Sequence, residues 1–358
     1  MSGSVRSGCM FRVAGGAAGA GATGGRSRGA AAVGLPPATG LRQRGSAVRL
    51  GADQATPPGR SLGPTKTQRP IDLHVEEPVT STPTQPEVEL QQPYDLPPGS
   101  ADAFAADGFV HLSDVVSPGV IEAYEPEVTG QVIELNTNHV PMAERDTYSK
   151  AFLQITNLWQ HSAKVEELVR SLRLARIATE LLGVRGVRLY HDQALYKEPG
   201  GGITPWHADG YYWPLATDRC CTIWLPLQET PKALGPLTFA RGSHKVDYGR
   251  DLAISDQSEE ELQAMIDENG FDIVEEPFAL GDASYHAGWT FHHASPNVSD
   301  EPRRVMTIIY VDADMEIAEP VNPAQVNDLA SWLGARPVGG KVGGPLNPVL
   351  YEREPADD

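Results

Sequence analysis

A short polar motif, His207-x-Asp209, stands between two apolar segments and constrains this chain more than any other feature. Residues 187–196 before it alternate apolar and polar side chains, and residues 221–227 after it are again apolar. Short runs of this kind, separated by glycine and proline, are typical of the strands of a β-sandwich or barrel. Because residues i and i+2 of a strand point to the same face, the imidazole and the carboxylate are expected to converge on one point.

An imidazole and a carboxylate at this spacing supply two ligands of the 2-His-1-carboxylate set, which holds Fe(II) and leaves three coordination positions open. The third ligand is expected to be a histidine on a distant strand. Phe291 is followed by two candidates, His292 and His293. The alternative interpretation of His207 and Asp209 is a structural hydrogen-bonded pair at a turn.

Residues 100–315 resemble the phytanoyl-CoA dioxygenase family of Fe(II)- and 2-oxoglutarate-dependent oxygenases. The resemblance depends on His207-x-Asp209, on a distal histidine with an arginine downstream, and on the pair Gly281-Asp282 before the distal strand. It implies a mainly β fold with flanking helices around a double-stranded β-helix (jelly-roll, cupin-like) core. It also implies Fe(II), 2-oxoglutarate and O2, used to hydroxylate a small-molecule substrate with release of succinate and CO2. The carboxylate of Asp209 favours hydroxylation, because halogenating members of the family lack it.

In that family, the arginine that pairs with the distal carboxylate of 2-oxoglutarate lies eleven residues after the metal histidine. Arg303 stands at this distance from His292, and Arg304 stands at the same distance from His293. The asparagine and the Pro-Arg pair of the family fit the first register, so the resemblance favours His292 and Arg303. His293 and Arg304 remain the alternates, and a surface salt bridge is the other interpretation of Arg303.

The same resemblance predicts which residues surround the metal. Trp224 and Thr222 lie on the strand that lines the 2-oxoglutarate pocket in the family, and Lys197 is a candidate second partner for a carboxylate. Core packing, or for Lys197 a solvated strand end, is the alternative for each of these. The substrate side is expected to include Tyr211, Tyr212, Trp213, Tyr190 and Gln193. No catalytic residue beyond the metal site is predicted.

Composition divides the chain at about residue 95. Residues 1–66 hold nine Lys/Arg against one acid, Asp53, with scarcely a bulky apolar side chain, and a Pro/Thr/Glu/Gln-rich stretch follows. Such a segment cannot bury enough apolar surface to offset its loss of conformational entropy. The sequence therefore predicts a disordered leader over residues 1–95 and the dioxygenase domain over residues 96–358. An organellar transit peptide or a start codon placed too early are other interpretations of the leader.

Charge and cysteine content limit the classes of partner. The chain after residue 66 holds 20 Lys/Arg against 46 Asp/Glu, which disfavours nucleic acid, because phosphate contacts need clustered cations. Three cysteines suggest a reducing compartment, here the cytoplasm, which would keep iron ferrous. No apolar run is long enough for a membrane span, so no membrane partner is expected. Nothing in the sequence indicates an oligomeric state.

Two other functional classes stay open. One is a cupin-like metalloenzyme that does not use 2-oxoglutarate, which would have no need of Arg303. The other is a non-catalytic barrel that binds a small molecule, which would have little reason to keep three metal ligands. Periodicity and caps also predict helices over residues 100–107, 161–182 and 258–269, and strands over residues 271–278, 283–286 and 304–311.

Overall fold

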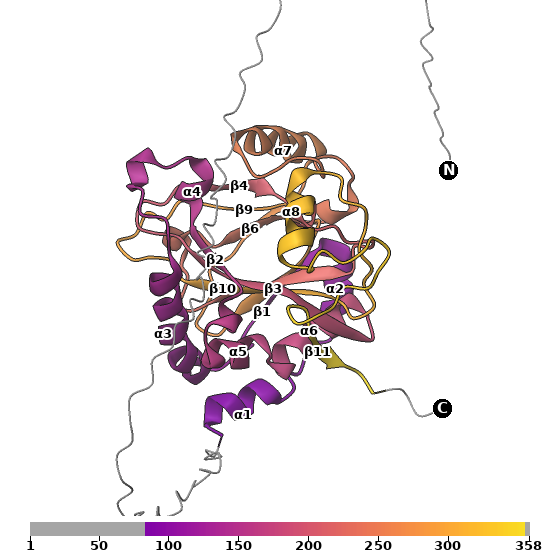
Figure 1. Ribbon diagram of the computed structural model, residues 1–358. Helices are drawn as coiled ribbons and strands as arrows, with labels where there is room; N and C mark the ends of the chain where they lie inside the picture. Colours follow the sequence, from indigo (N-terminus) through magenta and orange to yellow (C-terminus); the bar gives the residue numbers. More distant parts are fainter. Residues whose placement is uncertain (1–82, 355–358) are drawn as a thin grey trace, which may run out of the picture. The chain divides into compact units, whose positions relative to one another are not determined.

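Two antiparallel β-sheets form the centre of the fold (Figure 1). Side chains from both sheets line a cavity. The computed structural model describes residues 83–354, which belong to one compact unit, Glu76–Asp358. The large sheet has the order β1-β8-β5-β10-β3-β11, with β2 paired to β3, and the small sheet has the order β4-β9-β6-β7. The strands of the large sheet are β1 (Phe109–Leu112), β2 (Leu153–Thr156), β3 (Gly186–Tyr196), β5 (Cys220–Pro226), β8 (Ala283–Ala287), β10 (Val305–Asp312) and β11 (Val349–Glu352). Those of the small sheet are β4 (Thr204–His207), β6 (Leu237–Ala240), β7 (Ile273–Glu275) and β9 (His292–Ala294).

Strand alternation gives the large sheet two different faces. On β5, Cys221, Ile223 and Leu225 belong to a large apolar core, whereas Thr222 and Trp224 line the cavity. This division follows from the two-residue period of a strand, which sends neighbouring side chains to opposite faces. The position of each residue along β5 therefore decides whether it contributes to stability or to the site.

Helices cover the outer face of the large sheet (Figure 1). On α6 (Leu172–Leu182), buried Leu174, Ile177, Ala178 and Leu181 recur at helical spacing and pack in the same core as β5. The other helices on this side of the fold are α1 (Gln85–Gln91), α2 (Ser100–Asp107), α3 (Pro118–Leu135) and α5 (Ala163–Val169). None of the described helices has the length and apolarity needed to cross a bilayer.

On the side of the small sheet lie α4 (Thr147–Ala151) and α7 (Asp256–Asn269). α8 (Pro323–Ser331) packs instead against large-sheet residues, which include Tyr190 of β3 and Ile309 of β10. α7 contacts β4, which carries the metal motif, and it matches the helix predicted over residues 258–269 within two residues. The side chain of Ser255 caps α7 by accepting a hydrogen bond from the Ser258 amide.

Two predictions need correction. The single helix expected over residues 161–182 is two helices, because the Ser171 hydroxyl caps a new helix and donates to the Leu90 carbonyl at 2.9 Å. The ordered domain also begins earlier than residue 96, since α1 lies within the predicted leader and its Leu90 is 1% exposed. A burial this complete depends on contacts with α3 and α6, which are distant in the sequence. The rest of the predicted leader, residues 1–82, lies outside the described residues.

Candidate metal centre and cavity

The motif His207-x-Asp209 spans the end of a strand. β4 ends at His207, and Asp209 begins the short 3-10 helix η3 (Asp209–Tyr212). The expectation that both residues belong to one strand is therefore wrong, although Ala208 between them keeps an extended backbone. The turn is fixed by the Gly210 amide, which donates to the Gly288 carbonyl at 2.6 Å.

Strand β9 brings the second histidine to the motif. His292 is the register partner of His207 across the β4–β9 pair, and the two ring centroids lie 4.1 Å apart. His293 points to the other face, where its ring stacks on Trp206 with centroids 5.0 Å apart. The register of the small sheet therefore places His292, and not His293, beside Asp209.

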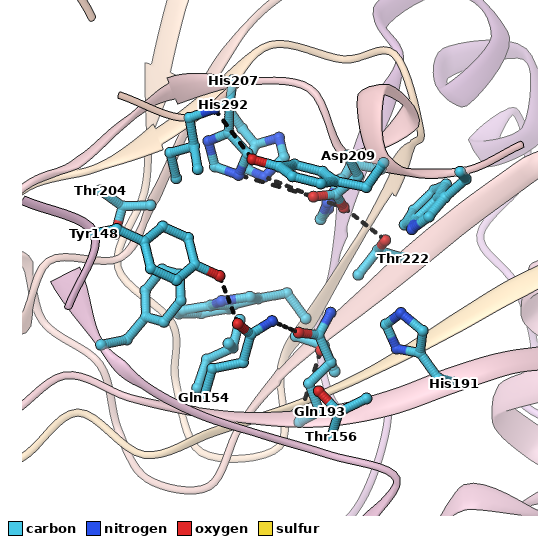
Figure 2. Close-up of a pocket in the computed structure, with 18 of the residues that line it drawn as sticks. Tyr148, Gln154, Thr156, His191, Gln193, Thr204, His207, Asp209, Thr222 and His292 are labelled. Carbon is cyan, nitrogen blue, oxygen red and sulfur yellow. Dashed lines mark hydrogen bonds and ion pairs between the residues drawn. The ribbon is translucent and has the colours of Figure 1, made fainter. Parts of the chain in front are cut away.

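The three residues present ligand atoms to one another, as Figure 2 shows. Asp209 Oδ1 lies 3.8 Å from His207 Nε2 and 3.7 Å from His292 Nε2. His207 Nδ1 lies 2.7 Å from the Pro205 carbonyl, and His292 Nδ1 lies 3.0 Å from the Thr290 carbonyl. A carbonyl oxygen only accepts, so each Nδ1 carries the proton and each Nε2 keeps a free lone pair.

The protonation states also suit a divalent cation. Burial lowers the pKa of His207, and burial together with the neighbouring His207 lowers the pKa of His292 well below its usual range. For Asp209, burial would raise the pKa, but the three imidazoles of His292, His286 and His207 hold it well below its ordinary value. Neutral imidazoles and an ionised carboxylate are the forms that bind metal, so these residues fit an Fe(II) ion.

Two further side chains hold the carboxylate of Asp209. Its Oδ2 atom accepts hydrogen bonds from Thr222 Oγ1 at 2.9 Å and from His286 Nε2 at 3.2 Å. This leaves Oδ1 facing the two histidines. Thr222, a predicted contact of 2-oxoglutarate, lines the cavity, and its hydroxyl bonds to the candidate metal ligand Asp209. His286 on β8 is not among the site residues predicted from the sequence, because no motif distinguishes it from a packed histidine.

Arg303 contributes an isolated positive charge to the cavity wall. Its side chain is 1% exposed, Nη1 donates to the Gly235 carbonyl at 2.5 Å, and the guanidinium lies 5.3 Å from the Trp224 ring centroid. Nε has no hydrogen-bond partner, and no carboxylate among residues 83–354 pairs with this guanidinium. Burial lowers the pKa of Arg303 to about 9, so the group remains charged at neutral pH. Arg304 points away from the cavity, with Nη1 3.2 Å from Glu125.

The structure does not bring Lys197 to the cavity. Its Nζ donates to the carbonyls of Gly202 at 2.8 Å and Ser295 at 2.9 Å, and the side chain is buried. Burial, and then the charge of Arg303, lowers the pKa of Lys197 to about 6. The Lys197 amino group holds the turn after β3 through these hydrogen bonds, so it is not free to bind a carboxylate of a ligand.

The predicted substrate side is only partly present in the cavity wall. Tyr212, Trp213 and Gln193 line the cavity, whose volume is about 320 Å³. Tyr211 and Tyr190 are not among the lining residues: the Tyr211 carbonyl anchors the loop before α8, and Tyr190 is fully buried. The aromatic cluster after the metal motif is thus divided between cavity wall and core.

Other lining residues come from segments that carry no recognisable signal. Tyr148 on α4 donates to Gln154 Oε1 at 2.5 Å, and Gln154 in turn donates to Gln193, so a polar chain crosses this wall (Figure 2). The remaining residues that sequence reasoning missed are Phe152, Thr156, His191, Leu195, Thr204, Leu237, Ile254, Thr307, Asn327, Asp328 and Trp332. Most are far from residues 207–213 in the sequence, and only the fold assembles them.

The sequence of this chain is similar to a known protein family and to a curated protein. The family model of phytanoyl-CoA dioxygenase (PhyH) matches residues 104–305. A curated relative, the probable alpha-ketoglutarate-dependent hypophosphite dioxygenase of Stutzerimonas stutzeri, is 27% identical over 175 residues, which cover 46% of this chain. The matched part spans only 59% of the length of that relative.

Solved structures share the architecture. The alpha-ketoglutarate-dependent carbocyclase SnoK from nogalamycin biosynthesis is 23% identical, with a TM-score of 0.60 over 73% of this chain and 100% of SnoK. The epimerase SnoN of the same biosynthesis is 23% identical, with a TM-score of 0.58 over 70% of this chain and 97% of SnoN. EctD from S. alaskensis is 21% identical, with a TM-score of 0.51 over 63% of this chain and 80% of EctD. These likenesses concern the fold, and they confirm the predicted jelly-roll core.

Proposed function

This chain belongs to the phytanoyl-CoA dioxygenase family, and from that membership and the cavity we propose that it is an Fe(II)- and 2-oxoglutarate-dependent dioxygenase acting on a small molecule. One observation carries the proposal. Three converging candidate metal ligands line the same cavity as a buried guanidinium that has no counter-ion among residues 83–354. A metal and a dicarboxylate are the two ligands that such an arrangement would satisfy together.

In this proposal, His207, Asp209 and His292 would hold Fe(II), and a set of three protein ligands would leave the remaining coordination positions open. When bound, the iron and 2-oxoglutarate supply the oxidising power for an unactivated C–H bond, with succinate and CO2 as coproducts. Thr222 and His286 restrain Asp209 through Oδ2, so that Oδ1 stays directed at the metal position.

Arg303 binds the distal carboxylate of 2-oxoglutarate. A guanidinium pairs with a carboxylate through two parallel hydrogen bonds, and burial strengthens the pair because little water competes for either group. Trp224 packs beside the guanidinium and restricts its position. The proposed anchor and the three ligands thus define the orientation of the cosubstrate, which fixes where the substrate meets the metal.

The aromatic and polar wall opposite these groups would hold the substrate. Phe152, Tyr212 and Trp213 line the cavity and keep water from the metal position, while Gln154 and Gln193 offer hydrogen bonds. We propose hydroxylation as the outcome, because the carboxylate ligand Asp209 is present.

The test is an anaerobic titration with Fe(II) and then with 2-oxoglutarate, followed by visible spectroscopy. We expect the charge-transfer band that arises when 2-oxoglutarate chelates Fe(II), and we expect no band in His207→Ala. Iron binding without the band would favour a cupin-like enzyme that does not use 2-oxoglutarate. Absence of iron binding would favour a non-catalytic barrel.

A further inference from the structure

A second buried carboxylate, Asp328, lines the same cavity as the metal ligands. It lies on α8, outside residues 104–305 that match the family, so it is a feature of this chain and not of the matched region. The side chain is 8% exposed. Its role is not accounted for by metal or 2-oxoglutarate binding.

Asp328 has hydrogen-bond donors but no counter-charge. Its Oδ2 atom accepts from the Tyr190 hydroxyl at 3.0 Å, and the Trp332 side chain is a second donor. Among residues 83–354, no cationic side chain forms an ion pair with this carboxylate. Burial raises the pKa of Asp328 to about 7, although both hydrogen bonds oppose that change. A buried carboxylate that lacks a counter-charge is stabilised by a ligand that carries a positive charge.

The groups around Asp328 are neutral or aromatic. The titratable side chains that face it are Tyr190 and His191 of β3, and Asp209 lies across the cavity. Burial lowers the pKa of His191 to about 4, so this imidazole is uncharged at neutral pH, and its Nδ1 has no hydrogen-bond partner in the described part of the chain. Trp332 and Trp213 both line the cavity, and the Trp332 ring lies 5.8 Å from that of His191. Aromatic rings beside a carboxylate are favourable surroundings for an organic cation.

The charge balance in the cavity also favours a cationic substrate. Among the lining residues, Arg303 is the one Lys or Arg side chain, and Asp209 and Asp328 are the acids. Fe(II), Asp209, Arg303 and doubly charged 2-oxoglutarate balance one another, which leaves the charge of Asp328 uncompensated. An anionic substrate would add to that charge. The volume of about 320 Å³, shared with 2-oxoglutarate, is at the small end for a ligand cavity, so the part of a substrate that it encloses is small.

We propose that Asp328 is a specificity-determining residue that binds a positively charged nitrogen, and that the substrate is a small organic cation. The inference rests on the proposed dioxygenase function, because it assumes that 2-oxoglutarate occupies Arg303. A neutral or anionic molecule would leave the Asp328 carboxylate without its counter-charge.

Calorimetric titration of the anaerobic protein loaded with Fe(II) and 2-oxoglutarate tests this inference. The probes are two cations and their neutral isosteres: choline with 3,3-dimethylbutan-1-ol, and ethanolammonium with propan-1-ol. We expect at least one cation to bind about tenfold or more tightly than its isostere. That preference should disappear in Asp328→Asn and persist in Glu319→Gln, which removes the same charge from an exposed position of the same segment.

Equal affinity for cation and isostere, no binding of either cation, or an unchanged preference in Asp328→Asn would overturn the proposal. If Asp328→Asn does not fold, Trp332→Leu replaces it. A greater loss of affinity for the cation than for the isostere then supports the proposal, and an equal loss overturns it. The visible band of Fe(II) with 2-oxoglutarate is recorded on the same samples. A missing band refutes the dioxygenase function independently of how the cations bind.

Discussion

Replacing Arg303 by methionine should make the ligand-free protein more stable while removing its response to 2-oxoglutarate. The guanidinium is buried, its one hydrogen bond goes to the Gly235 carbonyl, and it has no carboxylate partner among the described residues. If the role of this charge is to bind an anion, then without the anion the buried, unpaired guanidinium lowers the free energy of unfolding, because its desolvation is not compensated. Methionine has a similar length and no charge. The substitution therefore separates the effect of the charge on the stability of the ligand-free protein from its effect on 2-oxoglutarate binding.

The size of the effect follows from the pKa of Arg303. Burial lowers it from 12.5 to about 9, which at ~1.4 kcal/mol per pH unit corresponds to a cost of roughly 5 kcal/mol. Loss of the donor to the Gly235 carbonyl opposes this by about 1–3 kcal/mol. The net gain for Arg303→Met is then about 2–4 kcal/mol, which for a domain of this size raises the unfolding temperature by on the order of 10 °C.

The assay is thermal unfolding followed by circular dichroism, with and without 2-oxoglutarate, and with a divalent metal present. Wild type should be stabilised by 2-oxoglutarate, and Arg303→Met should not. Arg304→Met is the matched control, because this arginine is the next residue of the chain and forms a partly exposed ion pair with Glu125. It should lose no more than about 1 kcal/mol and keep the response to 2-oxoglutarate.

An Arg303→Met protein that is less stable than wild type without ligand would refute the reasoning, because the charge would then serve the fold. A response to 2-oxoglutarate that persists in Arg303→Met but disappears in Arg304→Met would show that the other register is correct.

Three further predictions concern the cavity. Thr222→Val removes the hydroxyl that holds Asp209 and should weaken Fe(II) binding about 10–100-fold in equilibrium dialysis. Thr238→Val, which removes a buried hydroxyl without a partner, should leave iron binding unchanged, and equal binding by both variants would contradict the assigned role of Thr222. Choline should bind about tenfold more weakly at pH 6 than at pH 8, because only the ionised carboxylate of Asp328, with a pKa of about 7, attracts a cation. An equal change for the neutral isostere would assign the pH dependence to another group. Removal of iron by a chelator should lower the unfolding temperature of wild type, and an unchanged temperature would argue against the metal site.

The sequence predicted the parts of the site that depend on local order. The His-x-Asp motif identified His207 and Asp209, although Asp209 lies beyond the end of β4. The apolar run of residues 221–227 predicted a strand, the family resemblance predicted that this strand lines the cavity, and Thr222 and Trp224 do line it. Spacing left His292 and His293 equally placed relative to Arg303 and Arg304. The register of β4 against β9 distinguishes the two histidines, and such a register depends on contacts between strands that are far apart in the sequence.

The wrong and missed predictions also arise from contacts between residues that are far apart in the sequence. Lys197 resembled a free cation at a strand end, but the chain turns after β3 and places backbone carbonyls around its Nζ. Leu90 lies in a segment too polar to suggest order, and its burial depends on α3 and α6. Asp328 follows the recognisable motifs by more than twenty residues, and only the packing of α8 brings it to the cavity. Local pattern was therefore enough to identify candidate metal ligands, whereas long-range packing distinguishes His292 from His293 and assembles the substrate side.

The most direct test of the dioxygenase function is succinate formation from 2-oxoglutarate by protein loaded with Fe(II) under anaerobic conditions and then exposed to O2. Wild type and Arg304→Met are expected to release succinate and CO2 in equal amounts, slowly without substrate. His207→Ala is expected to release none beyond the free-iron control. Failure of the iron-loaded wild type to form succinate, or equal formation by His207→Ala, would contradict the account.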